Sequence, residues 1–239
     1  MNEIDFSNIF IKPLFEEKIS LKEIDENNYD EILNLCDRFL IPSKILNNIL
    51  YENVQPNKLI EGLKKQLDIA TFKNLINKKE ILKIADLFNK NNIDHVFLKG
   101  SAINQIACDY TRHSRDIDIL VSKESLHSAY ELIKTIGYSY KNKLVSDESK
   151  YIRNLRHLPI LSNKDNALVE LHHRVTSKSH YKDCPLAELM LNKQETIKKK
   201  GVDVKIPDLN HLIIHIIYHA ALSHKFDFGP IFLLQKLWI

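Results

Sequence analysis

The chain has 239 residues, 44% of them hydrophobic, so it is long enough to bury the core of a catalytic domain with an additional helical lobe. Its formal net charge of +3 and isoelectric point near 8.6 are mild, which argues against a dedicated DNA-binding protein. The three dispersed cysteines, Cys36, Cys108 and Cys184, make neither a disulfide framework nor a zinc site, and they favour a reducing cytoplasm.

The first part of the chain, residues 1–80, is dominated by helical periodicity. Apolar side chains recur every three or four positions over residues 29–40 and again over residues 59–75. Pro42 and Pro56 mark breaks between these segments. The start of the chain carries acidic residues and lacks a basic segment before an apolar run, so we expect no signal peptide.

A Gly-Ser turn follows the short apolar run of residues 95–98. The run predicts a buried strand, and Gly100 with Ser101 predicts a tight turn with a helix beginning near Ala102. Backbone N–H groups at such a turn favour phosphate oxygens. Gly100 permits close backbone approach or an unusual φ, and the Ser101 hydroxyl adds one more donor.

Two aspartates lie in the next apolar run, residues 115–121, which predicts a second strand. Residues i and i+2 of a strand share a face, so Asp116 and Asp118 point together while Ile117 and Ile119 face the core. Two buried carboxylates repel each other unless a cation lies between them, and oxygen ligands favour Mg²⁺ or Mn²⁺. Either motif alone is weak, because Asp-x-Asp and Gly-Ser are common on exposed segments. Their combination next to apolar residues favours a catalytic site.

The following segments alternate between helix and strand. Residues 122–136 predict an amphipathic helix with Ser122 as its N-cap and Gly137 as its stop. Strands are expected at residues 157–161 and 167–175, and a strand-like run at residues 202–206 precedes the last helix.

A third acid, Glu170, lies among apolar residues in the strand predicted at 167–175. Strand alternation places Glu170 and His172 on one face and Val169 with Leu171 on the other. A two-metal phosphoryl-transfer site needs such an acid. On spacing alone, an ion pair between Glu170 and a neighbouring Lys or Arg explains the residue equally well.

The last helix is expected over residues 209–222 and carries a row of histidines. It is shorter than the roughly 20 apolar residues of a membrane span and is interrupted by histidines, so we expect a buried helix. His211, His215 and His219 recur every four residues and share a face. The row fits either a metal or nucleotide contact or a polar stripe that lines the catalytic cleft.

Several ordered motifs together resemble the uncharacterised bacterial nucleotidyltransferase family, a branch of the DNA polymerase β-like nucleotidyltransferase superfamily. The similarity runs from about Ile81 to Arg174 and continues more weakly to the C-terminus. Ser101 stands where the motif often has a second Gly, and the chain ends at residues 238–239 inside an expected helix, which suggests a truncated C-terminal lobe. The motifs that carry the resemblance are Phe97–Ser101, Arg115–Val121, Gly137–Tyr138 and Val169–Arg174.

The resemblance implies an α/β (α+β) fold, namely a polymerase β-like nucleotidyltransferase core with a small mixed sheet. We expect an N-terminal helical region over residues 1–80, the catalytic core over 81–180 and a C-terminal helical region over 181–239. The implied reaction transfers a nucleoside monophosphate from an NTP to an acceptor hydroxyl and releases pyrophosphate.

The resemblance also implies roles for individual residues. Gly100 and Ser101 would hold the triphosphate. Asp116, Asp118 and Glu170 would form the catalytic acid triad that binds Mg²⁺ or Mn²⁺, and Glu170, or a carboxylate that shares its metal, would be the proton acceptor. Two flanking cations, Lys99 and Arg115, either meet triphosphate oxygens or are solvated surface charges, and His172 is a candidate cleft residue.

The partners implied are an NTP, with ATP as the first candidate, and an unknown acceptor that is a small molecule, a peptide or RNA. Two other readings stay open. One is a toxin of the abortive-infection nucleotidyltransferase type that modifies tRNA or protein. The other is an inactive binding protein on the same fold, against which the presence of all three acids argues.

Overall fold

The computed structural model of the chain describes residues 18–50, 57–106, 114–141, 155–176 and 184–223, together with Ile9 and Lys12. Cys108, most of the polar segment after Tyr138 and the chain end at residues 238–239 lie outside this part. Contacts within the chain define two compact units, and the boundary falls between Asn74 and Leu75.

The first unit is helical, as expected. Two short 3₁₀ helices, η3 (Leu21–Glu23) and η4 (Glu26–Asn28), lead into α2 (Tyr29–Phe39), which ends where Leu40 takes a φ of 63°. Pro42 begins α3 (Pro42–Asn48), where its missing N–H costs nothing. Two two-residue strands, β1 (Ile19–Ser20) and β2 (Ile49–Leu50), pair in parallel.

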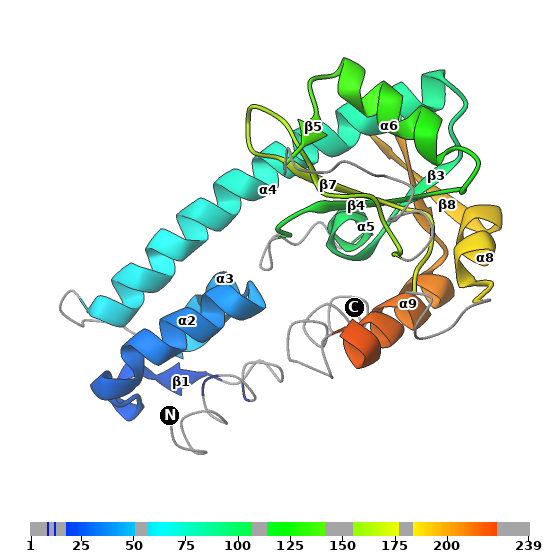
Figure 1. The fold of residues 1–239 in the computed structure, drawn as a ribbon. Coiled ribbons are helices and arrows are strands. Elements are labelled where there is room, and N and C mark those ends of the chain that lie inside the picture. Colours follow the sequence, from blue (N-terminus) through cyan, green and yellow to red (C-terminus); the bar gives the residue numbers. More distant parts are fainter. Residues whose placement is uncertain are drawn as a thin grey trace. The chain divides into compact units, whose positions relative to one another are not determined.

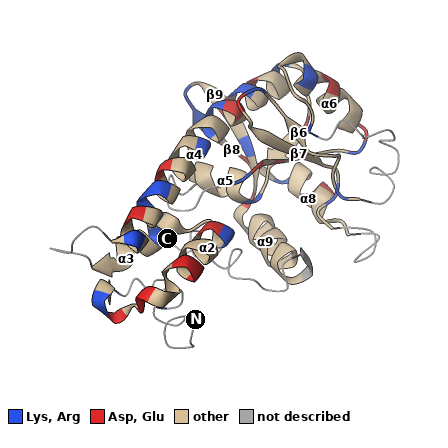
Figure 2. Ribbon diagram, turned by 60° about the vertical axis from the view of Figure 1, so that its left-hand side comes forward, with Lys and Arg blue, Asp and Glu red and all other residues tan. Residues whose placement is uncertain are grey.

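Helix α4 (Lys58–Lys90) is the longest element and extends from the first unit into the second (Figure 1). Its exposed side carries charges of both signs, as Figure 2 shows. In the second unit its buried side contributes Ile81, Ile84, Ala85 and Phe88 to an apolar core.

The second unit is built on a five-stranded mixed sheet with the order β3-β4-β7-β6-β5. Strands β4 and β7 are parallel, and the other neighbouring pairs are antiparallel. The expected small mixed sheet is therefore confirmed. Its strands are β3 (His95–Phe97), β4 (Ile117–Val121), β5 (Ser139–Tyr140), β6 (Leu161–Ser162) and β7 (Leu168–His172).

Helices surround this sheet (Figure 1). Helix α5 (Lys99–Ile106) follows β3 directly, and α6 (Leu126–Thr135) follows β4. Further along the chain, α8 (Leu186–Asn192) precedes a hairpin of β8 (Gln194–Lys199) and β9 (Val202–Pro207), and α9 (Leu209–Ser223) follows it. None of the helices in the described ranges is both long and apolar enough to cross a membrane.

Strand β4 divides its side chains between two surroundings. Ile117, Ile119 and Val121 join the large core that also contains residues of α4, α6 and α9. Leu120, which points the other way, packs in a smaller apolar cluster with residues of β3 and α8. The polar residues of β4 and β7 lie on the same side as Leu120.

Several boundaries differ from the sequence predictions. Strand β4 begins at Ile117, so Asp116 lies just before it. The helix expected near Ala102 begins three residues earlier, and α6 begins at Leu126, with Ser122 accepting a hydrogen bond from the backbone N–H of Ser125 in the preceding turn. Helix α9 is only half buried, because four of its apolar side chains are 39–44% exposed: Leu209, Ile214, Ile217 and Tyr218.

Candidate active site

Asp118 and Glu170 lie side by side because β4 and β7 are parallel and in register. Asp118 is the Cα partner of Glu170, and Leu120 is the partner of His172. The side chains of Asp118, Glu170 and His172 are all buried, and one ligand atom of each lies within 4.8 Å of the others. The predicted shared face of Glu170 and His172 is thus present, and the structure joins it to Asp118.

Asp118 is the centre of this cluster. Its Oδ1 accepts hydrogen bonds from Lys99 Nζ at 2.7 Å and lies 2.8 Å from His172 Nε2. His172 Nε2 is also 3.3 Å from Glu170 Oε2. The side chains of Asp118 and His172 are 2% and 1% exposed, so these charges interact in a nearly dry environment.

Electrostatic interactions separate the pKa values of the three acids. Burial alone would raise the pKa of Asp118, but the charge of Lys99 and the hydrogen bond from His172 outweigh it and hold that pKa well below its usual range. Burial and the neighbouring Asp118 carboxylate raise the pKa of Asp116 to about 7. Burial raises the pKa of Glu170, but the hydrogen bond from His172 and neighbouring charges outweigh it, so this pKa is lowered overall. The cluster thus carries more negative charge than Lys99 balances.

The first residues of α5 connect this helix to β4 and to the acid cluster. Lys99 takes a φ of 47°, whereas the described glycines with positive φ are Gly137 and Gly201. The unusual backbone conformation expected of Gly100 is therefore found at Lys99. The Ser101 hydroxyl is buried and accepts a hydrogen bond from the Asp118 backbone N–H at 3.3 Å, so here it holds β4 against α5.

The remaining predicted residue, Arg115, lies at an exposed position immediately before Asp116. Because it lies before β4 and is exposed, a contact with triphosphate oxygens and a solvated surface charge both stay predictions.

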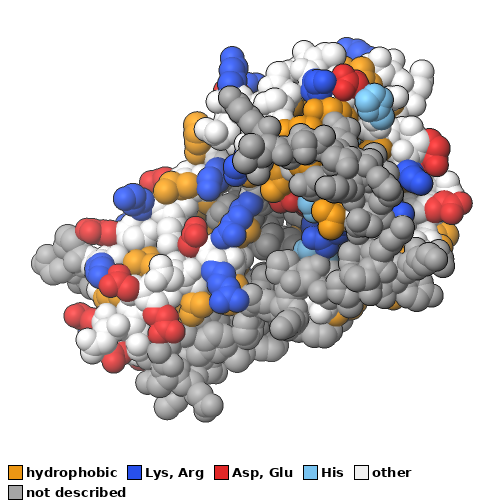
Figure 3. All heavy atoms as spheres, in the orientation of Figure 1, with side chains coloured by type: hydrophobic (Ala, Val, Ile, Leu, Met, Phe, Trp, Pro, Cys, Tyr) orange, Lys and Arg blue, Asp and Glu red, His pale blue; other side chains and the backbone are white. Residues whose placement is uncertain are grey.

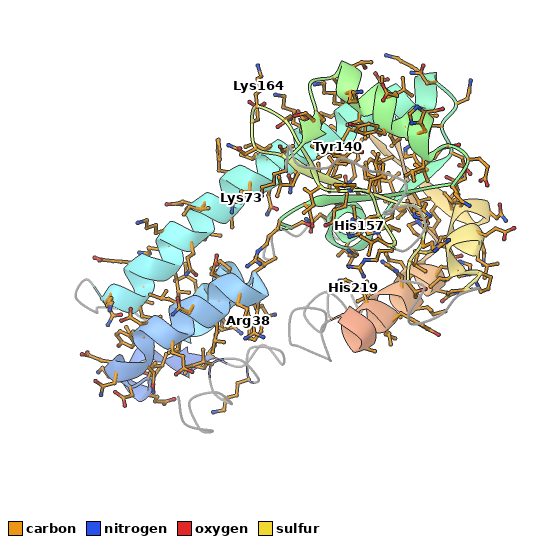
Figure 4. All side chains as sticks on the ribbon, viewed as in Figure 1. Arg38, Lys73, Tyr140, His157, Lys164 and His219 are labelled. Carbon is orange, nitrogen blue, oxygen red and sulfur yellow. The ribbon has the colours of Figure 1, made fainter. Side chains whose placement is uncertain are left out.

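A second histidine approaches the acids from the segment before β6. His157 forms an isolated antiparallel bridge with His172, and their ring centroids are 5.1 Å apart. His157 Nε2 is 3.8 Å from Glu170 Oε2, and its Nδ1 is 2.7 Å from the Leu158 carbonyl oxygen. Figure 4 shows His157 beneath the strands, on the side where α9 carries His219. Two imidazoles therefore meet the carboxylate of Glu170.

The three histidines of α9 have different partners. His211 Nδ1 is 2.5 Å from Asp208 Oδ2 at the start of the helix. His215 is 1% exposed, and His219 Nδ1 lies 3.3 Å from the guanidinium of Arg156. Figure 3 shows histidine, acidic and basic side chains gathered together on this face. The row is thus a polar stripe toward the acids rather than a set of three converging metal ligands.

Sequence reasoning missed Arg156, which lies in a segment without a recognisable motif. It also missed the direct bond between Lys99 and Asp118, because a residue two positions after a strand gives no indication of the direction of its side chain. The four-residue spacing of the histidines was the one signal that pointed to His215.

The sequence matches the family model described as uncharacterised nucleotidyltransferase over residues 26–234. Among curated proteins, no sequence matches the chain. The matched range includes the sheet with all three acids and the helices on both sides of it.

Three solved structures show a limited backbone similarity to the chain. An antigenic nucleotidyltransferase-like protein from Paracoccidioides brasiliensis has 13% identity and a TM-score of 0.47, with 67% of this chain and 74% of that chain covered. ANT(2″)-Ia in complex with adenylyl-2″-tobramycin has 16% identity and a TM-score of 0.44, with 66% and 84% covered. A solution structure of the antibiotic-resistance factor ANT(2″)-Ia has 14% identity and a TM-score of 0.46, with 67% and 83% covered.

Proposed function

The chain belongs to the family of uncharacterised nucleotidyltransferases, and from this premise we propose that it transfers a nucleoside monophosphate from an NTP to an acceptor hydroxyl and releases pyrophosphate. The observation that carries the proposal is the buried cluster of Asp118, Glu170 and His172 on two adjacent parallel strands. Asp116, whose carboxyl interacts with both acids of the cluster, completes a set of three carboxylates.

The donor set fits a divalent cation. Ligand atoms of Asp118, Glu170 and His172 lie within 4.8 Å of one another, and the pKa of Asp116 is raised first by burial and then by the Asp118 carboxylate, whose charge a cation would neutralise. We assign Asp116, Asp118 and Glu170 as ligands of Mg²⁺ or Mn²⁺, since carboxylates suit both ions. Once bound, such an ion lowers the pKa of the acceptor hydroxyl and neutralises charge on the phosphates.

The residues around the acids have complementary tasks. The backbone N–H groups of Gly100 and Ser101 at the start of α5 receive phosphate oxygens, because a helix start favours anions. Lys99 and Arg115 supply positive charge for the triphosphate. Glu170 accepts the proton of the acceptor hydroxyl, and the hydrogen bond from His172 keeps its carboxylate oriented.

The acceptor defines the alternatives. Three classes of protein would share this family and fold. They are an enzyme that modifies a small molecule or peptide, a toxin-type enzyme that modifies tRNA or protein, and an inactive nucleotide-binding protein. The presence of all three acids favours an active enzyme. We propose ATP as the first candidate for the donor. We also propose the cytoplasm as the compartment, because the cysteines are few and dispersed and both described ones, Cys36 and Cys184, are free.

Transfer of label from an NTP tests this function. The full chain would be incubated with each α-³²P-labelled NTP, Mg²⁺ or Mn²⁺, and separate small-molecule, RNA and protein fractions of a cell extract. We expect label in one fraction and an equal amount of pyrophosphate. Glu170→Gln should lower the rate about 1,000-fold, whereas Glu195→Gln, which changes an exposed carboxylate on β8, should leave it unchanged.

Each fraction separates one alternative from the others. Label in RNA or protein would identify the toxin-type reading, and label in the small-molecule fraction would exclude it. NTP binding without transfer to any fraction would contradict the enzyme and leave the binding protein.

A further inference from the structure

Arg156 and His219 form a paired basic group beside the acid cluster. The backbone carbonyl of Arg156 accepts hydrogen bonds from the N–H groups of His173 and Arg174, at 3.0 and 3.2 Å, which ties this segment to the end of β7. Its guanidinium Nη1 lies 3.3 Å from His219 Nδ1 on α9. The guanidinium is thus held where β7 and α9 approach each other.

His215 lies one helical turn before His219 and connects this pair to the acids. The two rings are stacked, with centroids 6.2 Å apart and an interplanar angle of 21°. His215 is 1% exposed, and within the described part of the chain neither of its ring nitrogens has a hydrogen-bond partner. A buried imidazole without hydrogen-bond partners is unusual, because buried polar atoms nearly always form hydrogen bonds.

The charges around His215 indicate which ligand would satisfy it. Burial first, and then the charges of Lys99, His172 and Arg156, lower the pKa of His215 to about 3, while Asp118 opposes them. The ring is therefore neutral and keeps one N–H donor. Because Lys99 and Arg156 are both cations and Asp118 is the one carboxylate among these neighbours, an anion is the ligand that fits this place.

We propose that Arg156, His215 and His219 form a subsite for the β- and γ-phosphates of the nucleotide. This inference rests on the proposed function and deepens it, since it names where the pyrophosphate leaving group is held. A guanidinium binds phosphate through two parallel hydrogen bonds, and the two imidazoles add ring N–H donors beside it. The His215 ring interacts with both Lys99 and His172, which links the subsite to the acid cluster.

The subsite predicts a selective effect on polyphosphate binding. Binding of inorganic tripolyphosphate, ATP and AMP, each with Mg²⁺, would be measured by calorimetry for the full chain. Arg156→Gln and His219→Gln should weaken tripolyphosphate and ATP about 10- to 100-fold, which corresponds to one charged hydrogen bond. AMP should change by no more than about two-fold, because it lacks the β- and γ-phosphates.

Control variants remove a positive charge and an imidazole elsewhere in the second unit. Lys164→Gln removes an exposed positive charge (labelled in Figure 4), and His127→Gln removes an exposed imidazole on α6. Both should bind tripolyphosphate as the wild type does. Binding of Mn²⁺ alone, measured by electron paramagnetic resonance, should be equal in all variants, which shows that the acid cluster is intact.

The proposal is overturned if the wild type does not bind tripolyphosphate, or if Arg156→Gln and His219→Gln bind it as well as the controls do. Equal weakening of AMP, Mn²⁺ and tripolyphosphate would also overturn it, because the residues would then be structural. Failure of the proposed function looks different: selective loss of tripolyphosphate binding would persist, but the wild type would transfer no label.

Discussion

Asp118 and Leu120 are two residues apart on the same side of β4, yet their surroundings are opposite. Leu120 is fully buried against apolar residues of β3 and α8, among them Val96 and Met190. Asp118 is 1% exposed and is surrounded by Lys99, two further acids and His172. Burial is the same at both positions, so the neighbouring side chains, and not depth, decide what each can do.

The two ends of this face contribute differently to stability. The Leu120 end gains from burial of apolar area, about 2 kcal/mol for a leucine side chain. At the Asp118 end, desolvation opposes ionisation and only paired charges compensate for it. The proposed metal site therefore lies at the end of this face that gains less from packing.

The largest expected effect comes from placing a carboxylate in the apolar end. Leu120→Asp should lower the free energy of unfolding by about 5 kcal/mol, because the new acid has no cation there and the packing is lost. Chemical denaturation monitored by circular dichroism measures this change. Leu120→Met, which preserves volume, should cost less than about 1.5 kcal/mol. An aspartate variant as stable as the wild type would show that the two ends do not differ.

A smaller effect concerns His95, a histidine on the apolar core side of β3. Burial is the main cause that lowers its pKa to about 4, and its ring lies between Phe88 and Phe97. In the unfolded chain His95 becomes protonated near pH 6.5, whereas in the folded chain it stays neutral until about pH 4. The neutral buried ring therefore costs no stability above pH 6.5, and the folded state loses stability as the pH falls from 6.5 toward 4. The loss should reach about 3 kcal/mol.

The variant His95→Asn isolates this contribution, since its amide can still donate to the Ile93 carbonyl that His95 Nδ1 contacts. Denaturant unfolding between pH 4 and pH 7 should show a weaker pH dependence in the variant than in the wild type. His127→Asn, at an exposed position, should keep the wild-type dependence. Identical curves for all three proteins would contradict the account.

The smallest effect concerns the contact that fixes the acidic strand. Ser101→Ala removes the hydroxyl that accepts from the Asp118 N–H, and should cost about 1–2 kcal/mol of unfolding free energy. Ser139→Ala, at an exposed position of β5, should stay within about 0.5 kcal/mol of the wild type. Thermal unfolding compares the two, and equal stabilities would mean that Ser101 does not hold the strand.

Much of the site was predictable because strand alternation is a strict rule. The positions of Asp118, Glu170 and His172 follow from two apolar runs, each with polar residues two positions apart. What the sequence could not give is the register between those runs, which depends on tertiary packing. The bond from Lys99 depends on the pairing of β3 with β4, and Arg156 is placed by its hydrogen bonds to the end of β7, so both emerged only with the structure.

Boundaries were less predictable for a local reason. The positive φ that Gly100 would permit is found one residue earlier, at Lys99. The ammonium of Lys99 binds Asp118. Tertiary interactions of this kind override the preference of a single residue for a backbone conformation. The helix α9 was expected to be buried from its composition, but hydropathy alone does not show which side of a helix has neighbours.

Binding of Mn²⁺ tests the central claim most directly, because it needs neither the acceptor nor the nucleotide. Titration followed by electron paramagnetic resonance would compare the wild type with Asp118→Asn and with Asp203→Asn, which changes an exposed carboxylate on β9. The account predicts that the wild type and Asp203→Asn bind Mn²⁺ alike and that Asp118→Asn binds it about 100-fold more weakly. Equal binding by all three proteins, or no binding by the wild type, would contradict the metal site proposed at Asp116, Asp118 and Glu170.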